Sequence, residues 1–201
     1  ITDQEIIDLI DSLENDERAK RDIPAALNWA RAIKLMVTFG LRPEELKHLE
    51  KKVDRKTKEE YLWCSYQKRA GGGMTEARRL YPLYPVNEKG VKQDWNLVEL
   101  FDRKDFLLPS LQNKNGVGEA CLKYLKRQKC WEQLIKNVEK RNERAGSYSF
   151  RHSYSVRGHL LDIDNGSMSL AMGHSIETHC REYPWATKSA TTNAFEIALA
   201  A

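Results

Sequence analysis

Residues 24–43, PAALNWARAIKLMVTFGLRP, decide the fold class of this chain. Apolar side chains recur every three or four positions in this stretch, which predicts an amphipathic helix over 24–39. Gly40 ends the pattern, and Pro43 is suited to the first turn of a short helix over 43–50. The stretch therefore predicts a long core helix, a sharp turn and a second, shorter helix.

The rest of the chain predicts more helices and one small hairpin. Thr2 and Glu5 form a capping box before an apolar run, which predicts a helix over 3–14. The aromatic stretch 61–66 indicates a strand, and a glycine-rich loop leads from it to a second strand or extended segment over 78–85. Further helices are predicted over 94–101, over 117–144 (as one or two), and over 149–161, 166–173 and 175–183. We therefore expect an α+β fold, mainly α with a small antiparallel β-sheet.

Composition limits the class of protein. The chain has 201 residues, of which 41% are hydrophobic and 31% charged, enough apolar material for a core of ordinary size. No apolar run is long enough to cross a membrane, and the N-terminus lacks a secretory pattern. The four cysteines are far apart with no CxxC pair, which argues against a zinc module or a disulfide framework. We expect a cytoplasmic domain without membrane contact and, because it begins at Ile1 rather than Met, a piece of a longer protein.

The basic residues are compatible with a polyanionic partner. The formal net charge is only +4, so the clustering of the cations carries more information than their number. Clustered cations can neutralise phosphates, whereas the alternative is solvated helix faces in which Lys and Glu alternate. The clusters are Lys68, Arg69, Arg78 and Arg79; Lys123, Lys126, Arg127 and Lys129; and Lys136, Lys140, Arg141 and Arg144.

Several common catalytic motifs are missing from the sequence. There is no phosphate-binding loop, and the three glycines at 71–73 lack the strand-to-helix context of a nucleotide fingerprint. No HExxH or EF-hand spacing occurs, nor an acidic set suited to two metal ions. His174, His179 and Cys180 are possible zinc ligands, but no fourth ligand follows at the usual spacing. We therefore expect no metal and no cofactor.

Three short segments contain the residues best suited to phosphate chemistry. They are GLRPEEL (40–46), SFRHSYS (149–155) and MGHSIETHCREY (172–183). Taken singly, each has an ordinary explanation: Arg42 as a surface partner of Glu45, His174 as a capping or packing residue, and Tyr183 as a core residue. Only the combination of the three segments favours a shared chemical role.

In this order, the segments resemble the two arginine boxes and the terminal G-H…Y box of the tyrosine recombinases, also called the phage integrase family. The resemblance covers nearly the whole chain, and the predicted hairpin lies between the first two boxes. It implies a catalytic domain over 1–188 and a tail over 189–201 that either docks on a neighbouring protomer or packs on its own domain. It also implies an N-terminal DNA-clamping domain that is not in this chain.

The resemblance assigns the residues that hold the DNA phosphate. Arg42 and Arg151 match the two arginines that bind the scissile phosphate. Glu45 matches the acidic residue that orients the first arginine, and His174 matches the His/Trp position that hydrogen-bonds the phosphate. Guanidiniums suit this task because they are permanently charged and donate in pairs.

The resemblance also assigns the nucleophile and the proton donor. Tyr183 matches the nucleophile, and Lys68, with Arg69 beside it as a weaker candidate, matches the lysine that protonates the leaving 5′ oxygen. The second box usually reads H-x-x-R, but Tyr148 stands at the histidine position. A phenol with a pKa of about 10 is a poor base near neutral pH, so the proton acceptor for Tyr183 stays open. His152 resembles a recurring structural histidine and is expected to pack or hydrogen-bond.

The implied activity is cleavage and rejoining of DNA strands through a covalent 3′-phosphotyrosine intermediate, without metal or ATP. The implied partner is double-stranded DNA in a prokaryotic or virus-encoded system. On DNA we expect a homo-oligomer, a tetramer, whereas a monomer stays open for the isolated chain. Candidate DNA contacts are Arg69, Arg78, Lys123, Lys126 and Arg127. Two alternatives stay open: a DNA-binding domain of the same fold with weak catalysis, and a basic helical module that binds RNA or protein.

Overall fold

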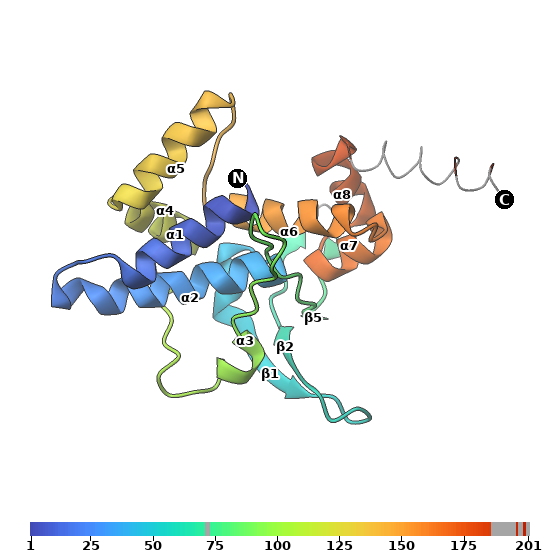
Figure 1. Ribbon diagram of the computed structural model, residues 1–201. Coiled ribbons are helices and arrows are strands. Elements are labelled where there is room, and N and C mark those ends of the chain that lie inside the picture. The colour runs from blue at the N-terminus through green and yellow to red at the C-terminus, as the bar shows by residue number, and fades with distance from the viewer. Residues whose placement is uncertain (71–72, 186–195, 197–198, 200–201) are drawn as a thin grey trace.

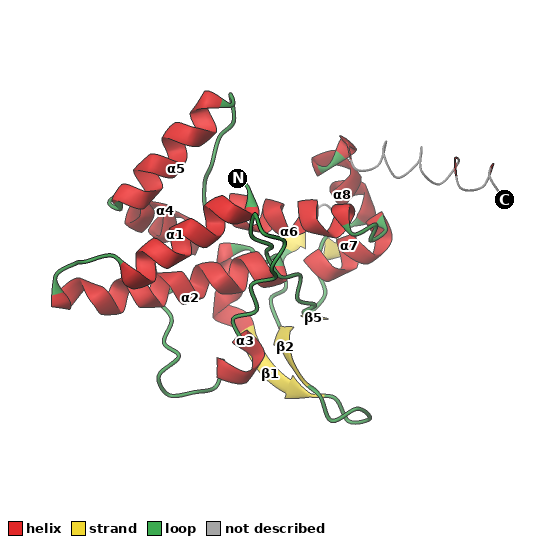
Figure 2. Cartoon of the chain, in the orientation of Figure 1, coloured by secondary structure: helices red, strands yellow, loops and turns green. Residues whose placement is uncertain are grey.

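The computed structural model describes residues 1–70, 73–185, 196 and 199 (Figure 1). Helices dominate the described part, and a small antiparallel sheet lies beside them (Figure 2), which confirms the expected α+β class. The α-helices are α1 (Asp3–Asn15), α2 (Ile23–Phe39), α3 (Leu97–Leu100), α4 (Val117–Leu125), α5 (Lys129–Lys140), α6 (Ser149–Leu160), α7 (Asn165–Met172) and α8 (Ile176–Glu182). The 3₁₀ helices are η1 (Lys20–Asp22) and η2 (Pro43–His48), and the strands are β1 (Leu49–Val53), β2 (Glu60–Cys64), β3 (Arg69–Ala70), β4 (Gly73–Met74) and β5 (Arg78–Arg79).

Helix α2 forms the centre of the hydrophobic core. It packs against α1 along one side and against α6 along another (Figure 1). Ile33, Leu35 and Met36 are completely buried, and the buried residues occupy more than one face of the helix. Each such aliphatic side chain contributes about 1.5–3 kcal/mol when it leaves water. Around this centre, α5 packs on α1, and α7 packs on α8.

Gly40 ends α2 in the left-handed conformation, with a φ of 62°. A Cβ atom at this position would lie 2.5 Å from the ring of Tyr154 on α6. That ring is buried, and its hydroxyl donates a hydrogen bond to the carbonyl oxygen of Tyr81 at 2.9 Å. Glycine at position 40 thus allows α2 to end directly against α6 while the chain turns towards Arg42.

The three-stranded sheet has the order β1-β2-β5 and is antiparallel throughout. β1 pairs with β2 along its whole length, starting with Leu49 opposite Cys64. β5 adds only two pairs to the other edge of β2, Arg78 with Cys64 and Arg79 with Trp63. Because neighbouring strand residues point to opposite faces, the two arginines of β5 leave the sheet in opposite directions.

Strand β1 corrects the helix that was expected over 43–50. Only Pro43–His48 are helical, as the 3₁₀ helix η2, and the chain then enters the sheet. In β1, Lys51 forms an ion pair with Glu60 of β2 at 2.7 Å in addition to the backbone ladder. For residues 49 and 50, pairing with β2 therefore outweighs the helical pattern of the local sequence.

Most other expected elements are present with changed boundaries. The capping box of Thr2 and Glu5 opens α1 as expected. The region 117–144 contains two helices, α4 and α5, and the last three predicted helices correspond to α6, α7 and α8. Of the expected strand over 78–85 only β5 pairs in the sheet, and of the helix over 94–101 only α3 forms.

Two expectations concern the surroundings and the end of the chain. Among the residues that the structure describes, no helix is both long and apolar enough to span a membrane. The tail over 189–201 lies outside the described residues except at positions 196 and 199. The domain boundary at 188 and the docking of the tail therefore stay predictions from sequence.

Candidate functional site

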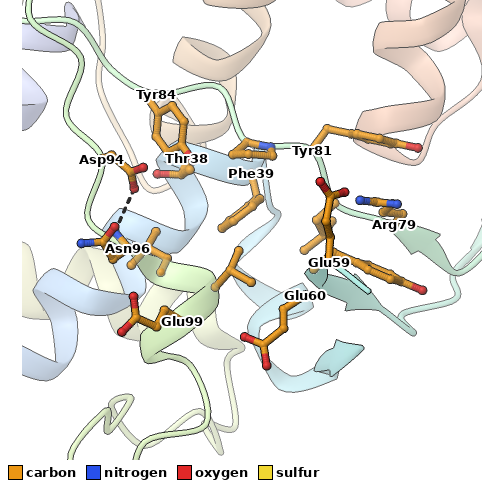
Figure 3. Close-up of a pocket in the computed structure, with 15 residues that line it drawn as sticks. Thr38, Phe39, Glu59, Glu60, Arg79, Tyr81, Tyr84, Asp94, Asn96 and Glu99 are labelled. Atoms are coloured by element: carbon orange, nitrogen blue, oxygen red, sulfur yellow. Dashed lines mark hydrogen bonds between the residues drawn. The ribbon is translucent and has the colours of Figure 1, made fainter. Parts of the chain in front are cut away.

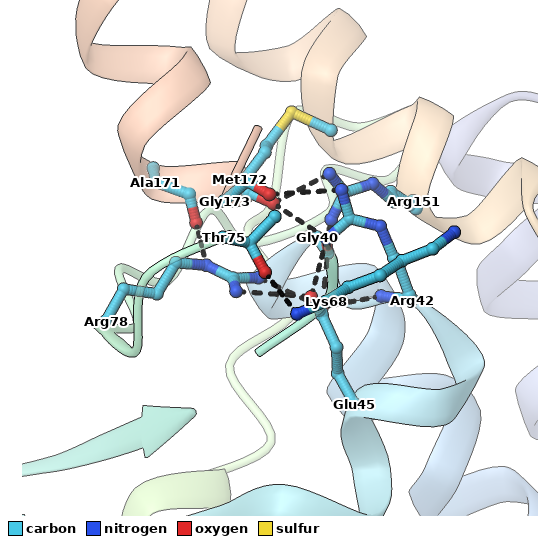
Figure 4. A network of polar contacts seen from close by, with 10 residues as sticks. All are labelled: Gly40, Arg42, Glu45, Lys68, Thr75, Arg78, Arg151, Ala171, Met172 and Gly173. Carbon is cyan, nitrogen blue, oxygen red and sulfur yellow. Dashed lines mark hydrogen bonds and ion pairs between the residues drawn. The ribbon is translucent and has the colours of Figure 1, made fainter. Parts of the chain in front are cut away.

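A buried carboxylate, that of Glu45, binds three arginines (Figure 4). Arg42 donates from Nη1 to Oε1 at 2.7 Å. Arg78 donates to both carboxylate oxygens, at 3.2 and 2.9 Å, and Nη1 of Arg151 lies 3.8 Å from Oε2. Three positive charges thus surround one negative charge, and the group is called the arginine cluster below (Arg42, Glu45, Arg78 and Arg151).

The sequence GLRPEEL positions the first pair of this cluster through local backbone geometry. Arg42 precedes η2, and its backbone N–H donates to Oε2 of Glu45 at 2.8 Å. In return, the N–H of Glu45 donates to the carbonyl oxygen of Arg42 at 2.9 Å. Pro43 suits the first turn because its missing N–H would have no partner there. The motif therefore fixes the acid and its arginine as one unit.

The last turn of α7 supplies a second set of acceptors. The carbonyl oxygens of residues 171–173 accept hydrogen bonds from Arg42, Arg78 and Arg151, at distances from 2.7 to 3.4 Å (Figure 4). A helix C-terminus carries partial negative charge, which favours cations at this place. Gly173 ends α7 with a φ of 64°, and a Cβ atom there would lie 2.5 Å from Nη1 of Arg78. Glycine is therefore needed where the arginines meet the helix.

The charges of the cluster are strongly coupled. Burial raises the pKa of the Glu45 carboxyl, but Arg78, Arg151 and Arg42 outweigh burial and hold the pKa below its ordinary value. Burial and the neighbouring Arg42 lower the pKa of Arg151 to about 9, so its guanidinium is still charged at neutral pH. The cluster thus keeps a net positive charge. Arg42, whose side chain is 17% exposed, is its most accessible cation.

Tyr183 lies beside this cluster and is buried, with 5% of its surface exposed. Its Oη atom is 2.8 Å from Nδ1 of His152 on α6. Burial raises the pKa of Tyr183, while Arg151 is close enough to oppose this shift. The phenol is therefore protonated at neutral pH and hydrogen-bonded to an imidazole.

Three further histidines form a chain next to Tyr183. Nε2 of His174 is 2.9 Å from Nδ1 of His179, and Nε2 of His179 is 2.9 Å from Nε2 of His159. The ring of His179 is also centred 4.9 Å from the ring of Tyr183. Burial, together with nearby Arg151, lowers the pKa of His174 to about 3, and burial and His159 lower the pKa of His179 to about 4. The chain of histidines is therefore neutral at pH 7.

The structure brings together most of the residues expected from the sequence. The cluster contains Arg42, Glu45 and Arg151. His174 follows directly on Gly173, whose carbonyl binds Arg42, and Tyr183 lies among the histidines that continue from it. Of these histidines, His159 was not expected as part of a site, and His179 was considered only as a possible zinc ligand.

Two of the expected residues have exposed side chains. Lys68 begins the hairpin of β3 and β4, where its backbone N–H donates to Oγ1 of Thr75 at 2.8 Å (Figure 4). The Lys68 residue is exposed, so its ammonium is accessible to solvent. Tyr148 precedes α6, and 49% of its surface is exposed.

Arg78 requires a correction, because it was expected as a surface contact for DNA. Its side chain is only 8% exposed and donates to Glu45 and to the carbonyl oxygen of Ala171. Its neighbour Arg79 occupies the other face of the sheet, with its guanidinium 4.3 Å from the ring centre of Tyr61. Arg78 is thus the third member of the arginine cluster.

The other expected DNA contacts differ in how far the structure describes them. Lys123, Lys126 and Arg127 are exposed at the end of α4. The side chain of Arg69 lies outside the described part of the chain. The helix-end cations therefore form an accessible basic surface.

A separate pocket of about 610 Å³ lies on the side of Arg79 (Figure 3). Glu59, Glu60, Asp94 and Glu99 contribute to its lining, and no member of the arginine cluster does. With four carboxylates, this pocket is poorly suited to a phosphate. The arginine cluster and the adjacent tyrosine are the better candidate for anion chemistry.

The described residues contain no group of three or more His, Cys, Asp or Glu side chains that could hold a metal ion. This includes His174, His179 and Cys180, which the sequence left as possible zinc ligands. Comparisons with family models, with curated proteins and with solved structures found no match to this chain. The functional interpretation therefore rests on the sequence segments and on the geometry of the site.

Proposed function

We propose that this chain is the catalytic domain of a tyrosine recombinase, which cuts and rejoins DNA strands through a covalent bond between Tyr183 and a 3′ phosphate. The observation that carries the proposal is the arrangement of three arginines around one buried carboxylate beside a buried tyrosine. A purely structural ion pair needs one cation for each anion. The excess of positive charge supports an anionic ligand.

The chemistry of phosphodiester cleavage fits this excess charge. Attack by a phenol on phosphorus increases the negative charge on the two non-bridging oxygens. Fixed guanidiniums stabilise that charge without having to reorganise, in the way that preorganised donors act in other enzymes. Arg42 is the accessible donor for these oxygens. Arg151 donates hydrogen bonds to the carbonyl oxygens of Gly40 and Met172, so its positive charge is held in a fixed position near the phosphate.

Two steps remain after the attack by Tyr183: protonation of the leaving 5′ oxygen and rejoining of the strand. The exposed ammonium of Lys68 is suited to protonate the leaving 5′ oxygen, because it carries three donatable protons on a long, flexible side chain. The phosphotyrosine bond keeps the energy of the phosphodiester. A 5′ hydroxyl of another strand can therefore reverse the reaction without ATP.

The proposal is tested with a nicked suicide DNA substrate that carries the parent protein's recombination site, in the presence of EDTA. The wild-type chain is expected to form a covalent protein–DNA adduct that survives denaturing electrophoresis. Tyr183→Phe removes the attacking oxygen, and Arg151→Ala removes a guanidinium, so both are expected to abolish the adduct. An adduct of undiminished yield with Tyr183→Phe would refute the assignment of the nucleophile.

DNA binding is measured in the same samples by a mobility shift. Binding that weakens with salt and occurs without any adduct would favour a DNA-binding domain of weak catalysis. In the proposed family an N-terminal domain supplies further DNA contacts, so a longer chain that includes such a domain serves as the comparison. An adduct with the longer chain but not with this one would assign the defect to those contacts.

A further inference from the structure

We infer that His152 is the catalytic base that takes the proton of the Tyr183 hydroxyl, a role which the family resemblance had left open because Tyr148 replaces the usual histidine. This inference rests on the proposed strand cleavage by Tyr183. It differs from the expectation that His152 only packs or hydrogen-bonds. The base would thus lie one residue after the arginine of the second box instead of three residues before it.

The geometry between the two side chains is suited to direct proton transfer. Nδ1 of His152 is 2.8 Å from Oη of Tyr183, within the range required of a general base. The rings meet edge to face, with centres 5.7 Å apart and an interplanar angle of 67°. The ring nitrogen of His152, and not its π face, therefore reaches the phenol.

The protonation states agree with the direction of transfer. Burial raises the pKa of Tyr183, so its oxygen carries a proton and donates the hydrogen bond. Burial and the neighbouring Arg151 lower the pKa of His152, so the imidazole is neutral and Nδ1 can accept. Neutral imidazole then carries its hydrogen on Nε2. Burial of the His152 ring is only partial and the residue as a whole is accessible, so its imidazole can exchange protons with solvent.

Other groups near Tyr183 are less suitable as the base. The ring of His179 is closer, but both of its nitrogens bind other histidines. Tyr148 is half exposed, and a phenol is a weak base near neutral pH. His152 combines a neutral ring, a direct contact with the hydroxyl and access to water.

The proposed step balances as follows. Tyr183 Oη forms a bond to phosphorus while its proton passes to Nδ1 of His152, which becomes imidazolium. The bond from phosphorus to the 5′ oxygen breaks, and that oxygen takes a proton from Lys68. In the rejoining step the imidazolium returns its proton to the departing phenolate. One residue thus serves as base and then as acid.

Charged side chains from two helices act on His152. Arg151, on the same helix, lowers its pKa, whereas Glu182 of α8 raises it. Since burial and Arg151 prevail, the imidazole is a competent acceptor at neutral pH. The rate of cleavage is therefore expected to fall as the pH decreases and His152 becomes protonated.

The test compares rates of adduct formation on the suicide substrate for the wild-type chain, His152→Ala, His152→Gln and the control His48→Gln. His48 is a suitable control because its ring contacts that of Tyr66, with centres 5.0 Å apart, and belongs to η2 instead of the helices around Tyr183. General-base catalysis contributes about 100-fold or more, so both His152 variants are expected to slow cleavage by about that factor. The decline of the rate at acidic pH should disappear with them, and added imidazole should partly restore His152→Ala.

A second substrate separates the base from a role at the leaving group. A 5′-bridging phosphorothiolate releases a thiolate, which needs no proton, so it should leave the defect of the His152 variants unchanged. Wild-type rates for His152→Ala, an unchanged pH profile, or full rescue by the phosphorothiolate would overturn the inference. In each case an adduct with the wild-type chain would leave the proposed function intact, whereas the absence of that adduct would count against the function itself.

Discussion

The guanidinium of Arg78 donates two hydrogen bonds to the carboxylate of Glu45, at 3.2 and 2.9 Å. This pair joins β5 to η2, and the same carboxylate also binds Arg42. Glu45 is completely buried, so its charge is compensated by protein groups and not by water. The cluster is consequently sensitive to the loss of any one charge.

We predict that Glu45→Gln destabilises the fold by about 3–5 kcal/mol, because it leaves three buried or half-buried guanidiniums without their counter-charge. The free energy of unfolding is measured by urea denaturation near pH 7. Glu132→Gln is the matched control, since Glu132 pairs with Lys136 on the exposed face of α5. The control should change stability by less than about 1 kcal/mol. Equal effects of the two substitutions would contradict the central role of Glu45.

We predict that Gly173→Ala is more destabilising than Gly90→Ala. Both glycines have positive φ values, 64° and 77°, so the backbone strain is similar. A Cβ atom at Gly90 meets nothing within 4 Å, whereas one at Gly173 meets the guanidinium of Arg78. Backbone strain lowers the free energy of unfolding by about 1 kcal/mol in both variants. Displacement of Arg78 lowers it further in Gly173→Ala. Thermal unfolding of the two variants compares them directly, and similar melting temperatures would refute the prediction.

We predict that stability decreases from pH 6.5 towards about pH 4. In the folded chain, His174 and His179 have pKa values of about 3 and about 4, below the ordinary value of 6.5. The unfolded chain therefore binds protons first, and the stabilisation present above pH 6.5 is lost as the pH falls. Each histidine contributes at most about 1.4 kcal/mol per pH unit.

The measurement for this pH dependence is denaturant unfolding at several pH values. His179→Gln should reduce the slope between pH 6.5 and 4. A slope that survives in His179→Gln at full size would show that other groups dominate the acid sensitivity. Glu45, whose folded pKa is lowered, adds a loss only at more acidic pH.

We predict that Lys68→Ala slows adduct formation by about 100-fold on ordinary DNA, because the leaving 5′ oxygen loses its proton donor. A 5′-bridging phosphorothiolate should restore the rate, since a thiolate leaves without a proton. Lys89→Ala, at another exposed lysine, is the control and should behave as wild type on both substrates. Failure of the sulfur substrate to restore Lys68→Ala would remove this lysine from the leaving-group step.

We predict that the triple substitution of Lys123, Lys126 and Arg127 by alanine weakens DNA binding at all sequences alike. If each cation contacts one phosphate, the slope of log affinity against log salt should become shallower by about 2.7. The double substitution Lys89→Ala and Lys104→Ala, at exposed positions elsewhere, provides the comparison. An unchanged slope in the triple variant would place the DNA on another surface.

Local patterns were sufficient to predict most of the helices but not the whole sheet. The apolar periodicity of α2 and the capping box of α1 act within one segment, and both appear as expected. β1 depends on pairing with β2, a contact between segments, and its sequence LEKKV carries no strong strand signal. The existence of an α+β fold was therefore predictable, whereas the register of its sheet was not.

In the candidate site, too, local motifs identified some residues, whereas other contacts depend on tertiary packing. The segments around Arg42 and Arg151 identified two members of the cluster, and GLRPEEL included Glu45. Arg78 was assigned to DNA contact because it lies among the basic residues that bracket the glycine-rich turn. Its contact with Glu45 depends on the pairing of β5 with β2, which the local sequence does not indicate. The contact of His152 with Tyr183 depends on how α6 and α8 are rotated against each other, which tertiary packing determines.

The carbonyl oxygens at the end of α7 have a consequence for synthesis of the chain on the ribosome. Until residues 171–173 have emerged, Arg42, Arg78 and Arg151 lack the acceptors that hold them in place. A nascent chain that ends earlier cannot complete the arginine cluster. Translation thus delivers the turn that holds the cations and Tyr183 almost together, and a chain that ends before residue 171 lacks both.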